Sequence, residues 1–337
     1  MNILPPDKIL LTGGREVGGV ESFATGLAAG FTELGIAAEV LSPGRLLSRR
    51  AELRDVRVLK ILGTTALFAA PFARRTICVA HGVPRADAMG WSRVIGINAG
   101  YKLANLLPGT MLIAVSDYTA AQLRSTFNLR VDGAIRNPVL PIFQEPFDGA
   151  EQNRNLITYV GRLIPSKGID RLLPAIRTLL EEQPDLGACF IGEGELRPML
   201  EEAARANPRI VVSGPLESRR VRDWLRRTRV FVSGNPVEPF GITYVEALTQ
   251  GCVVAMPASG GGLEIAIDQI GRQVQLLPIS LQPGETITVL RRALTFRGVP
   301  LAMETYSARA VARAYLDMDL QRVVPAGWIR EPVQAAT

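Results

Sequence analysis

Short apolar runs with strand character alternate with helical patterns along most of this chain, and that alternation limits the folds it can adopt. In the first half, strand-like runs lie at 9–12, 37–41, 56–61, 76–80 and 112–115, with helical patterns between them. Repeated βα units of this length indicate a parallel sheet that helices cover on both faces. Ligands of such sheets bind beyond the carboxyl ends of the strands. We therefore expect an α/β protein whose functional residues follow its strands.

Length and composition predict two domains. The chain has 337 residues, of which 47% are hydrophobic and 21% charged, as in folded globular proteins. The stretch 140–155 combines prolines, a glycine and polar residues, which is typical of a linker. We predict a first domain over 1–143, a second domain over 144–305 and a C-terminal segment over 306–337.

The net charge of +6 predicts attraction to an anionic partner. Phosphorylated ligands, an anionic membrane surface and nucleic acid all qualify. Only 6% of residues are aromatic and no stacking platform lies among basic residues, which argues against nucleic acid. A basic run in the first half predicts either a solvated helix face or a contact with an anionic membrane. Its members are Arg45, Arg49, Arg50, Arg54, Arg57, Lys60, Arg74 and Arg75.

Cysteine use and hydropathy predict a cytoplasmic protein. Cys78, Cys189 and Cys252 are scattered beside strand-like residues, which is typical of buried free thiols. No apolar run reaches the roughly 20 residues that a membrane-spanning helix needs. Residues 1–10 lack the order of charged and apolar residues found in a secretion signal. We expect the cytoplasm, with the inner face of the cell membrane as the alternative location.

The segment 230–256 carries the strongest functional pattern. A buried-strand pattern at 230–232 leads into a loop broken by proline and glycine, and a helix then runs to Gly251. Its two carboxylates are Glu238 in the loop and Glu246 in the helix. Their spacing alone is most often that of two incidental surface glutamates, so the residues between them decide the interpretation.

The start of that helix predicts an anion site. Pro239 keeps the loop carboxylate off the helix, so we expect the loop to fold back until both carboxylates face the space above the helix start. The free N–H groups of Gly241, Ile242 and Thr243 attract an anion there. Carboxylates suit the hydroxyls of a sugar and amides suit phosphates. The segment therefore predicts a site for a sugar diphosphate.

Three further loops follow predicted strands. Arg162 and Lys167 flank one of them, and a guanidinium and an ammonium suit a diphosphate that gains negative charge as it leaves. Gly192 lies in the turn after the next strand. Gly18 and Gly19 close a glycine-rich turn that opens the first helix, without the G-x-G-x-x-G spacing of dinucleotide-binding proteins. Taken singly, such residues are more often solvated cations or tight turns.

The chain has one histidine, His81, directly after the strand pattern 76–80. A loop hydrogen bond is the common role of a lone histidine, but a strand end favours contact with a ligand. Asp317 and Asp319 spell a D-x-D pattern inside a terminal helical segment, where we expect surface residues. The arginines of the helical pattern 218–227 are likewise expected in solvent. No other cluster has metal-ligand spacing, so we predict no metal cofactor.

Five motifs in this order resemble those of the retaining glycosyltransferases of family 4, also called glycosyltransferase group 1. They are the loop Gly18-Gly19-Val20-Glu21, the histidine His81, the stretch 161–170 of the GR-x-x-x-x-KG-x-D kind, the E-x7-E pair of Glu238 and Glu246, and the loop 258–265 of the GG-x-x-E kind. Leu263 stands in the last loop where proline is usual, which is a mild departure.

The resemblance covers nearly the whole chain and implies the GT-B fold, in which two Rossmann-like domains with parallel sheets face an interdomain cleft. The first domain would bind the acceptor, the second would hold the nucleotide sugar, and the last helix would cross back to the first domain. The implied reaction moves a hexosyl group from a UDP- or GDP-linked sugar to a hydroxyl of a glycan or lipid-linked acceptor. It would proceed with retention of configuration and without a metal ion.

The resemblance also implies roles for the candidate residues. The leaving diphosphate would be stabilised by Arg162, Lys167 and the amides near Gly18, Gly19, Gly241 and Ile242. Glu238 would orient sugar hydroxyls and Glu246 would hold the ribose. His81 would lie against the sugar, and Gly192 would lie near the nucleotide.

Two alternatives remain open at the level of the sequence. A sugar-nucleotide epimerase of the same fold would need more acid and base groups than one histidine. A glycosyltransferase-like partner protein would keep the cleft without turnover. The candidate cations and carboxylates favour an enzyme over such a partner.

Overall fold

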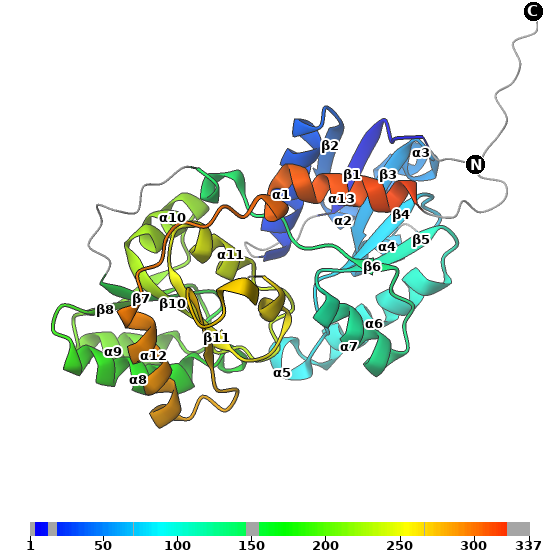
Figure 1. The fold of residues 1–337 in the computed structure, drawn as a ribbon. Coiled ribbons are helices and arrows are strands. Elements are labelled where there is room, and N and C mark those ends of the chain that lie inside the picture. Colours follow the sequence, from blue (N-terminus) through cyan, green and yellow to red (C-terminus); the bar gives the residue numbers. More distant parts are fainter. Residues whose placement is uncertain (1–3, 13–18, 70, 146–154, 266, 322–337) are drawn as a thin grey trace, which may run out of the picture. The chain divides into compact units, whose positions relative to one another are not determined.

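The computed structural model describes residues 4–12, 19–69, 71–145, 155–265 and 267–321. The chain forms two compact units, each with its own parallel sheet (Figure 1). Unit 1 comprises residues 1–138 and 305–337, and unit 2 comprises residues 139–304. The chain therefore enters unit 2 once and returns to unit 1 near its end.

Unit 1 contains six parallel strands in the order β2-β1-β3-β4-β5-β6. They are β1 (Lys8–Thr12), β2 (Ala37–Leu41), β3 (Val58–Gly63), β4 (Thr76–Ala80), β5 (Thr110–Ala114) and β6 (Gly133–Ala134). Nearly every residue of the four strands in the middle of this order is buried, as their apolar sequences predict.

The helices of unit 1 are α1 (Gly19–Glu33), α2 (Pro43–Leu46), α3 (Arg50–Arg54), α4 (Thr64–Ala69), α5 (Ala86–Met89), α6 (Trp91–Leu106), α7 (Asp117–Phe127) and α13 (Ala308–Leu320). Although α1 and α13 come from opposite ends of the chain, they pack against each other. The contact is close at Gly30, where an added Cβ would lie 1.9 Å from the carbonyl oxygen of Ala308. Glycine is therefore required at this crossing.

Unit 2 contains six parallel strands in the order β12-β11-β10-β7-β8-β9. They are β7 (Leu156–Val160), β8 (Gly187–Ile191), β9 (Ile210–Gly214), β10 (Thr228–Val232), β11 (Val253–Pro257) and β12 (Val274–Leu277). This is the Rossmann order, and its direction reverses between β7 and β10. Ligands of such sheets bind beyond the carboxyl ends of the strands at that reversal.

The helices of unit 2 are α8 (Ile169–Glu182), α9 (Arg197–Ala206), α10 (Ser218–Arg227), α11 (Ile242–Thr249) and α12 (Pro283–Thr295). α8, α9 and α12 bury their apolar residues in one core with the strands. α10 and α11 contact β7, β10 and β11. The structure confirms the predicted α/β class with two parallel sheets, while the cleft between two domains stays a prediction.

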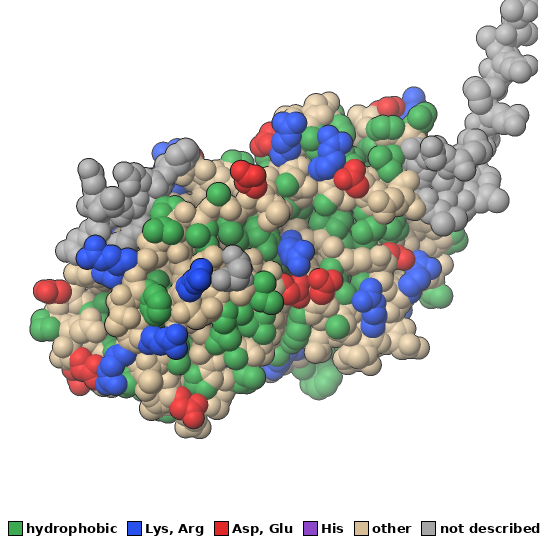
Figure 2. Space-filling view, in the orientation of Figure 1, with side chains coloured by type: hydrophobic (Ala, Val, Ile, Leu, Met, Phe, Trp, Pro, Cys, Tyr) green, Lys and Arg blue, Asp and Glu red, His purple; other side chains and the backbone are tan. Residues whose placement is uncertain are grey.

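The basic run of the first half does not form a uniform surface face. Lys60 is fully buried on β3, and its Nζ donates to the carbonyl oxygens of Asp55 at 2.6 Å and Val58 at 2.8 Å. The Arg75 side chain is also buried. On the face drawn in Figure 2, Lys and Arg side chains are interspersed with Asp and Glu. The expectation of solvated cations is therefore wrong for Lys60 and Arg75.

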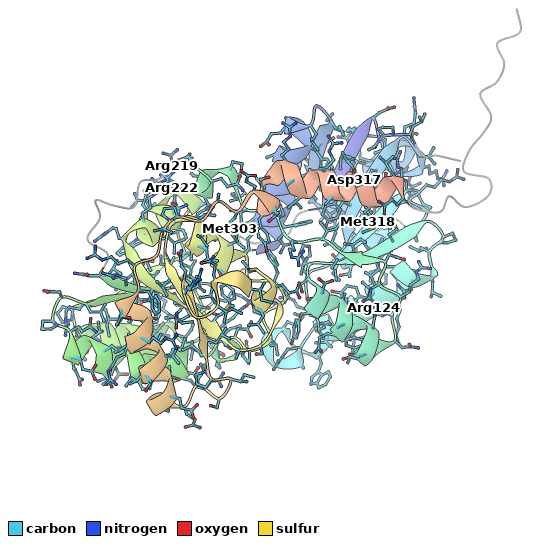
Figure 3. The ribbon with its side chains drawn as sticks, in the orientation of Figure 1. Arg124, Arg219, Arg222, Met303, Asp317 and Met318 are labelled. Carbon is cyan, nitrogen blue, oxygen red and sulfur yellow. The ribbon has the colours of Figure 1, made fainter. Side chains whose placement is uncertain are left out.

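The two aspartates of the D-x-D pattern on α13 differ in their exposure to solvent. Asp317 is exposed and is labelled on α13 in Figure 3. Asp319 is fully buried, and its Oδ2 accepts from Arg75 Nε at 2.9 Å and from Nη2 at 2.7 Å. The prediction of a surface residue is wrong for Asp319, because residues two apart on a helix point to different sides.

α10 shows the same effect. Its pattern predicts solvated arginines, but Arg222 is buried and forms ion pairs with Glu145 and Asp223.

The three cysteines are free and buried, as predicted. Within the described residues, no helix combines the length and hydropathy needed to cross a bilayer.

Candidate active site

The loops after β7 and β10 meet at the reversal of the unit 2 sheet. Gly168 has a φ of +69°, and a Cβ there would lie 2.5 Å from the carbonyl oxygen of Gly234. A Cβ on Gly234 would in turn lie 2.9 Å from the carbonyl oxygen of Gly168. Two glycines thus allow the two backbones to touch. This contact brings the residues beside the glycines within reach of one another.

Lys167 and Glu238 form an ion pair at this contact. Lys167 Nζ lies 2.7 Å from Glu238 Oε2, and the two residues are 71 positions apart in the sequence. Asn235 Nδ2 donates to the same oxygen at 2.7 Å. The two side chains are only 20% and 19% exposed, so solvent screens the pair less than a surface ion pair. The sequence singled out both residues, and the structure places them together.

The surroundings keep Glu238 ionised. Desolvation raises the pKa of the Glu238 carboxyl, but the charge and hydrogen bond of Lys167, the amide of Asn235 and the charge of Arg162 more than offset this, so its pKa lies below the ordinary value. A carboxylate of this kind accepts hydrogen bonds from hydroxyl groups and does not serve as an acid at neutral pH.

The turn after β8 packs directly on the loop that carries Arg162. A Cβ on Gly192 would lie 1.8 Å from the carbonyl oxygen of Gly161, so only glycine fits there. Tyr159 Oη donates to the carbonyl oxygen of Arg162 at 2.8 Å and fixes the backbone of the same loop. The Arg162 side chain is exposed and contributes charge toward Glu238.

An uncapped helix start completes the loop after β10. α11 begins at Ile242, and Gly241 precedes it with a φ of +92° and without a side-chain cap. The first N–H groups of the helix are therefore available to an anion. The ring of Tyr244 lies beneath this turn, 2.5 Å from where a Cβ on Gly241 would be, and its Oη donates to Ser233 Oγ at 2.8 Å.

The loop after β11 reaches the same region. Gly261 N donates to the carbonyl oxygen of Glu238 at 2.8 Å, and Ser259 Oγ donates to the carbonyl oxygen of Pro236 at 2.6 Å. Gly260 has a φ of +87° and its Cβ would lie 3.0 Å from the Glu238 carbonyl oxygen. Backbone contacts on this side therefore hold the loop that carries the carboxylate.

Glu246 differs from Glu238 in its surroundings. It is 7% exposed on α11, and within the described residues its carboxyl group has no hydrogen bond or ion pair, including none with Lys167. Desolvation raises the pKa of Glu246 to about 8. A buried carboxyl without a partner suits a ligand that brings hydroxyl groups. The structure does not place the two glutamates in contact.

The remaining candidates belong to unit 1. His81 follows β4, and its ring meets the ring of Phe23 edge-on at 4.7 Å between centroids. Burial lowers the pKa of His81 to about 4, so the imidazole is neutral at physiological pH. Gly19 begins α1, and Gly18 lies outside the described residues. Their roles toward a donor stay predictions.

Three supporting residues escaped the sequence interpretation. Asn235 lies three positions before Glu238, a polar position that any loop could have. Gly234 looked like an ordinary turn residue because its partner Gly168 is distant in sequence. Tyr244 looked like part of a helix face. The juxtaposition of β7 and β10 gives Gly234 its role, whereas Asn235 and Tyr244 gain theirs from contacts within the segment after β10.

The part of the chain that the structure describes contains no candidate metal-binding site. No three side chains of His, Cys, Asp or Glu gather there as a metal ion would require. Metal independence stays a prediction.

Comparison with solved structures defines the class of fold. Anabaena Alr3699/HepE in complex with UDP and glucose aligns with a TM-score of 0.65 at 16% identity, over 93% of this chain and 95% of that chain. WaaG, a glycosyltransferase involved in lipopolysaccharide biosynthesis, aligns with a TM-score of 0.64 at 16% identity, over 92% and 95%. The chain has the two-sheet GT-B fold of these structures.

Comparison of sequences defines the family resemblance more narrowly. Residues 143–274, which contain all the unit 2 candidates, match the family model "Glycosyl transferases group 1". One component of the human phosphatidylinositol N-acetylglucosaminyltransferase is 30% identical over 68% of this chain and 52% of its own length. A D-inositol 3-phosphate glycosyltransferase of Streptomyces scabiei is 32% identical over 35% of this chain and 29% of its own.

The chain thus spans about half or less of the length of these curated relatives. Residues 143–274 therefore resemble group 1 glycosyl transferases, and the chain shares the fold of the solved structures above.

Proposed function

We propose that this protein is a retaining glycosyltransferase of family 4 that moves a hexosyl group from a nucleotide sugar to a hydroxyl of a glycan or lipid-linked acceptor. The observation that carries the proposal is the Lys167–Glu238 pair at the reversal of the unit 2 sheet. A cation, a carboxylate and an uncapped helix start lie on two adjoining loops, which is what a sugar joined to a diphosphate requires.

In this reaction the bond between the anomeric carbon and the diphosphate breaks, and its electron pair leaves with the diphosphate. The acceptor oxygen forms the new bond on the same face of the sugar, and its proton passes to an oxygen of the departing phosphate. Lys167, Arg162 and the amide groups of Gly241 and Ile242 stabilise the charge that develops there. No protein nucleophile is required.

The carboxylates have different tasks in this proposal. Glu238 is ionised and accepts hydrogen bonds from the sugar hydroxyls, which orients the sugar. Glu246 is buried, has no hydrogen-bond or ion-pair partner among the described residues, and with its pKa raised to about 8 is a neutral carboxyl group that exchanges hydrogen bonds with the ribose hydroxyls of the nucleotide. His81, neutral at its strand end, lies against the transferred sugar.

The donor is a UDP- or GDP-linked hexose. The structurally similar HepE was solved in complex with UDP and glucose, which favours a uridine nucleotide as the donor of this protein. The acceptor belongs to cell-surface polysaccharide or glycolipid synthesis on the cytoplasmic side, with peripheral contact to an anionic membrane. Catalysis needs no metal ion.

A panel of UDP- and GDP-sugars tests the proposal. A donor that binds the folded protein raises the melting temperature, because binding stabilises by RT ln(1 + [L]/Kd). The stabilising donor is then incubated with glycan and lipid-linked acceptors, and the anomeric configuration of the product is determined.

A product with retained configuration supports the assignment. Release of an epimerised nucleotide sugar without acceptor would instead establish the epimerase, and failure of every donor to bind would refute the donor site.

A further inference from the structure

Besides Arg162 and Lys167 of the candidate active site, unit 2 has a second group of basic residues, on α10. One face of this helix carries an open hollow of about 370 Å³, lined by Arg219, Arg220, Asp223, Trp224 and Arg227. Figure 3 labels Arg219 on this helix. The lining residues recur at intervals of three and four, so they form two adjoining rows on one helix face.

The acidic residue of the hollow, Asp223, is paired with Arg222, which also pairs with Glu145. Asp223 Oδ1 accepts from Arg222 Nε at 3.1 Å and from Arg222 Nη2 at 3.0 Å. Within the described residues, neither Arg219 nor Arg220 forms an ion pair, and both side chains are exposed. In this part of the chain, both charges are therefore available to an anion.

Trp224 and Arg227 close the other end of the hollow. The Arg227 guanidinium lies over the Trp224 ring, 5.0 Å from its centroid, and it too forms no ion pair among the residues described. The indole is only partly buried. This end therefore offers a flat apolar surface beside a third positive charge.

Helix stability explains Arg227, which lies in the last turn of α10, but it does not explain Arg219 and Arg220. α10 has no acidic residue in its first turn, and the Glu217 side chain at its N-cap makes no capping hydrogen bond. Cations at a helix N-terminus oppose the helix dipole, whereas an anion there is favourable. Arg219 and Arg220 thus raise the free energy of the empty helix, and an anion between them would reverse this effect.

We propose that the α10 hollow binds a phosphoryl group, with its oxygens on Arg219 and Arg220 and the adjoining organic part of the ligand on Trp224. A guanidinium fork matches two phosphate oxygens, and the hollow has room for a phosphate monoester. The group belongs either to a soluble phosphate ester or to a lipid headgroup. The site does not depend on the proposed glycosyl transfer.

The indole N–H resonance of Trp224, assigned by its loss in Trp224→Phe, reports on this hollow and on no other site. We expect inorganic phosphate and glycerol 3-phosphate to shift it in the wild-type protein. Combining Arg219→Gln, Arg220→Gln and Arg227→Gln is expected to weaken the binding at least about tenfold, because the charged donors are lost.

A control variant combines Arg177→Gln, Arg309→Gln and Arg313→Gln, three exposed arginines without ion pairs in the described structure. It loses the same charge and is expected to bind phosphate as the wild type does. Equal weakening in both triple variants, or no shift of Trp224 in the wild type, would overturn the proposal.

Sedimentation with phosphatidylcholine vesicles, with and without phosphatidic acid, distinguishes the two sources. A shift of Trp224 with vesicle binding that only the α10 variant loses assigns the site to a lipid headgroup. A shift of Trp224 without vesicle binding that depends on α10 assigns it to a soluble ester.

Discussion

Glu246 shows how one buried residue couples this fold to pH. Its carboxyl has a pKa of about 8 in the folded chain and an ordinary value of 4.5. Between these two values the folded chain keeps a proton that the unfolded chain releases. The stabilising effect of that proton is complete below about pH 4.5 and is lost as the pH rises toward 8.

We therefore predict that Glu246→Gln, which keeps the shape but cannot ionise, becomes more stable relative to wild type as the pH rises. The free energy of unfolding of the two proteins should converge near pH 4.5 and diverge by up to about 1.4 kcal/mol per pH unit above it. Urea unfolding across this range measures the difference. A difference that is constant with pH would show that Glu246 is ionised in the folded chain.

At the same scale, the sequence predicted residue types better than it predicted partners. Lys167 and Glu238 were singled out because a cation and a carboxylate follow predicted strands, and they form a pair. Asn235 was missed because a loop amide gains its role only from the oxygen that it contacts. Asp319 was misjudged because its partner lies 244 positions away.

Among the elements, α13 is held to unit 1 by the ion pair between Asp319 and Arg75, both of them buried. Removing one partner of a buried pair leaves an uncompensated charge, which typically costs about 3–5 kcal/mol. We predict that Asp319→Asn lowers the stability of unit 1 by an amount of this order. Chemical unfolding measures the loss.

Asp317→Asn provides the control, because Asp317 lies on the same helix but is exposed. Its effect is expected to stay within about 0.5 kcal/mol. Similar effects of the two substitutions would argue that the buried pair contributes nothing to the attachment of α13.

The boundaries of helices could be predicted best where a glycine or proline marks the end of the element. α11 begins at Ile242 because Gly241 adopts a left-handed conformation, and the sequence pattern foresaw that start. The helical pattern between the predicted strands at 37–41 and 56–61 instead forms α2, a short 3-10 turn and α3. Helical propensity alone does not show where a helix is interrupted.

For the whole molecule, alternation of strands and helices predicted the α/β class but not the order of strands. Unit 2 has the Rossmann order, whereas unit 1 has β2 at one edge and β6 at the other. Strand order decides which loops adjoin, and β7 beside β10 is what joins Lys167 to Glu238. A pattern read along one chain contains no direct signal for such a pairing.

The central claim is that Lys167 and Glu238 hold the donor of a glycosyl transfer. Turnover of the donor found in the nucleotide-sugar panel tests it most directly, measured for Lys167→Ala, Glu238→Ala and the exposed-cation control Arg177→Ala. We predict that the first two lose transfer by at least about a hundredfold while keeping the fold. Lys167→Ala loses charge stabilisation of the leaving group, which is worth several kcal/mol, and Glu238→Ala loses the hydrogen bonds that orient the sugar. Arg177→Ala is expected to match wild type. Transfer near the wild-type rate in Lys167→Ala or Glu238→Ala would contradict the claim.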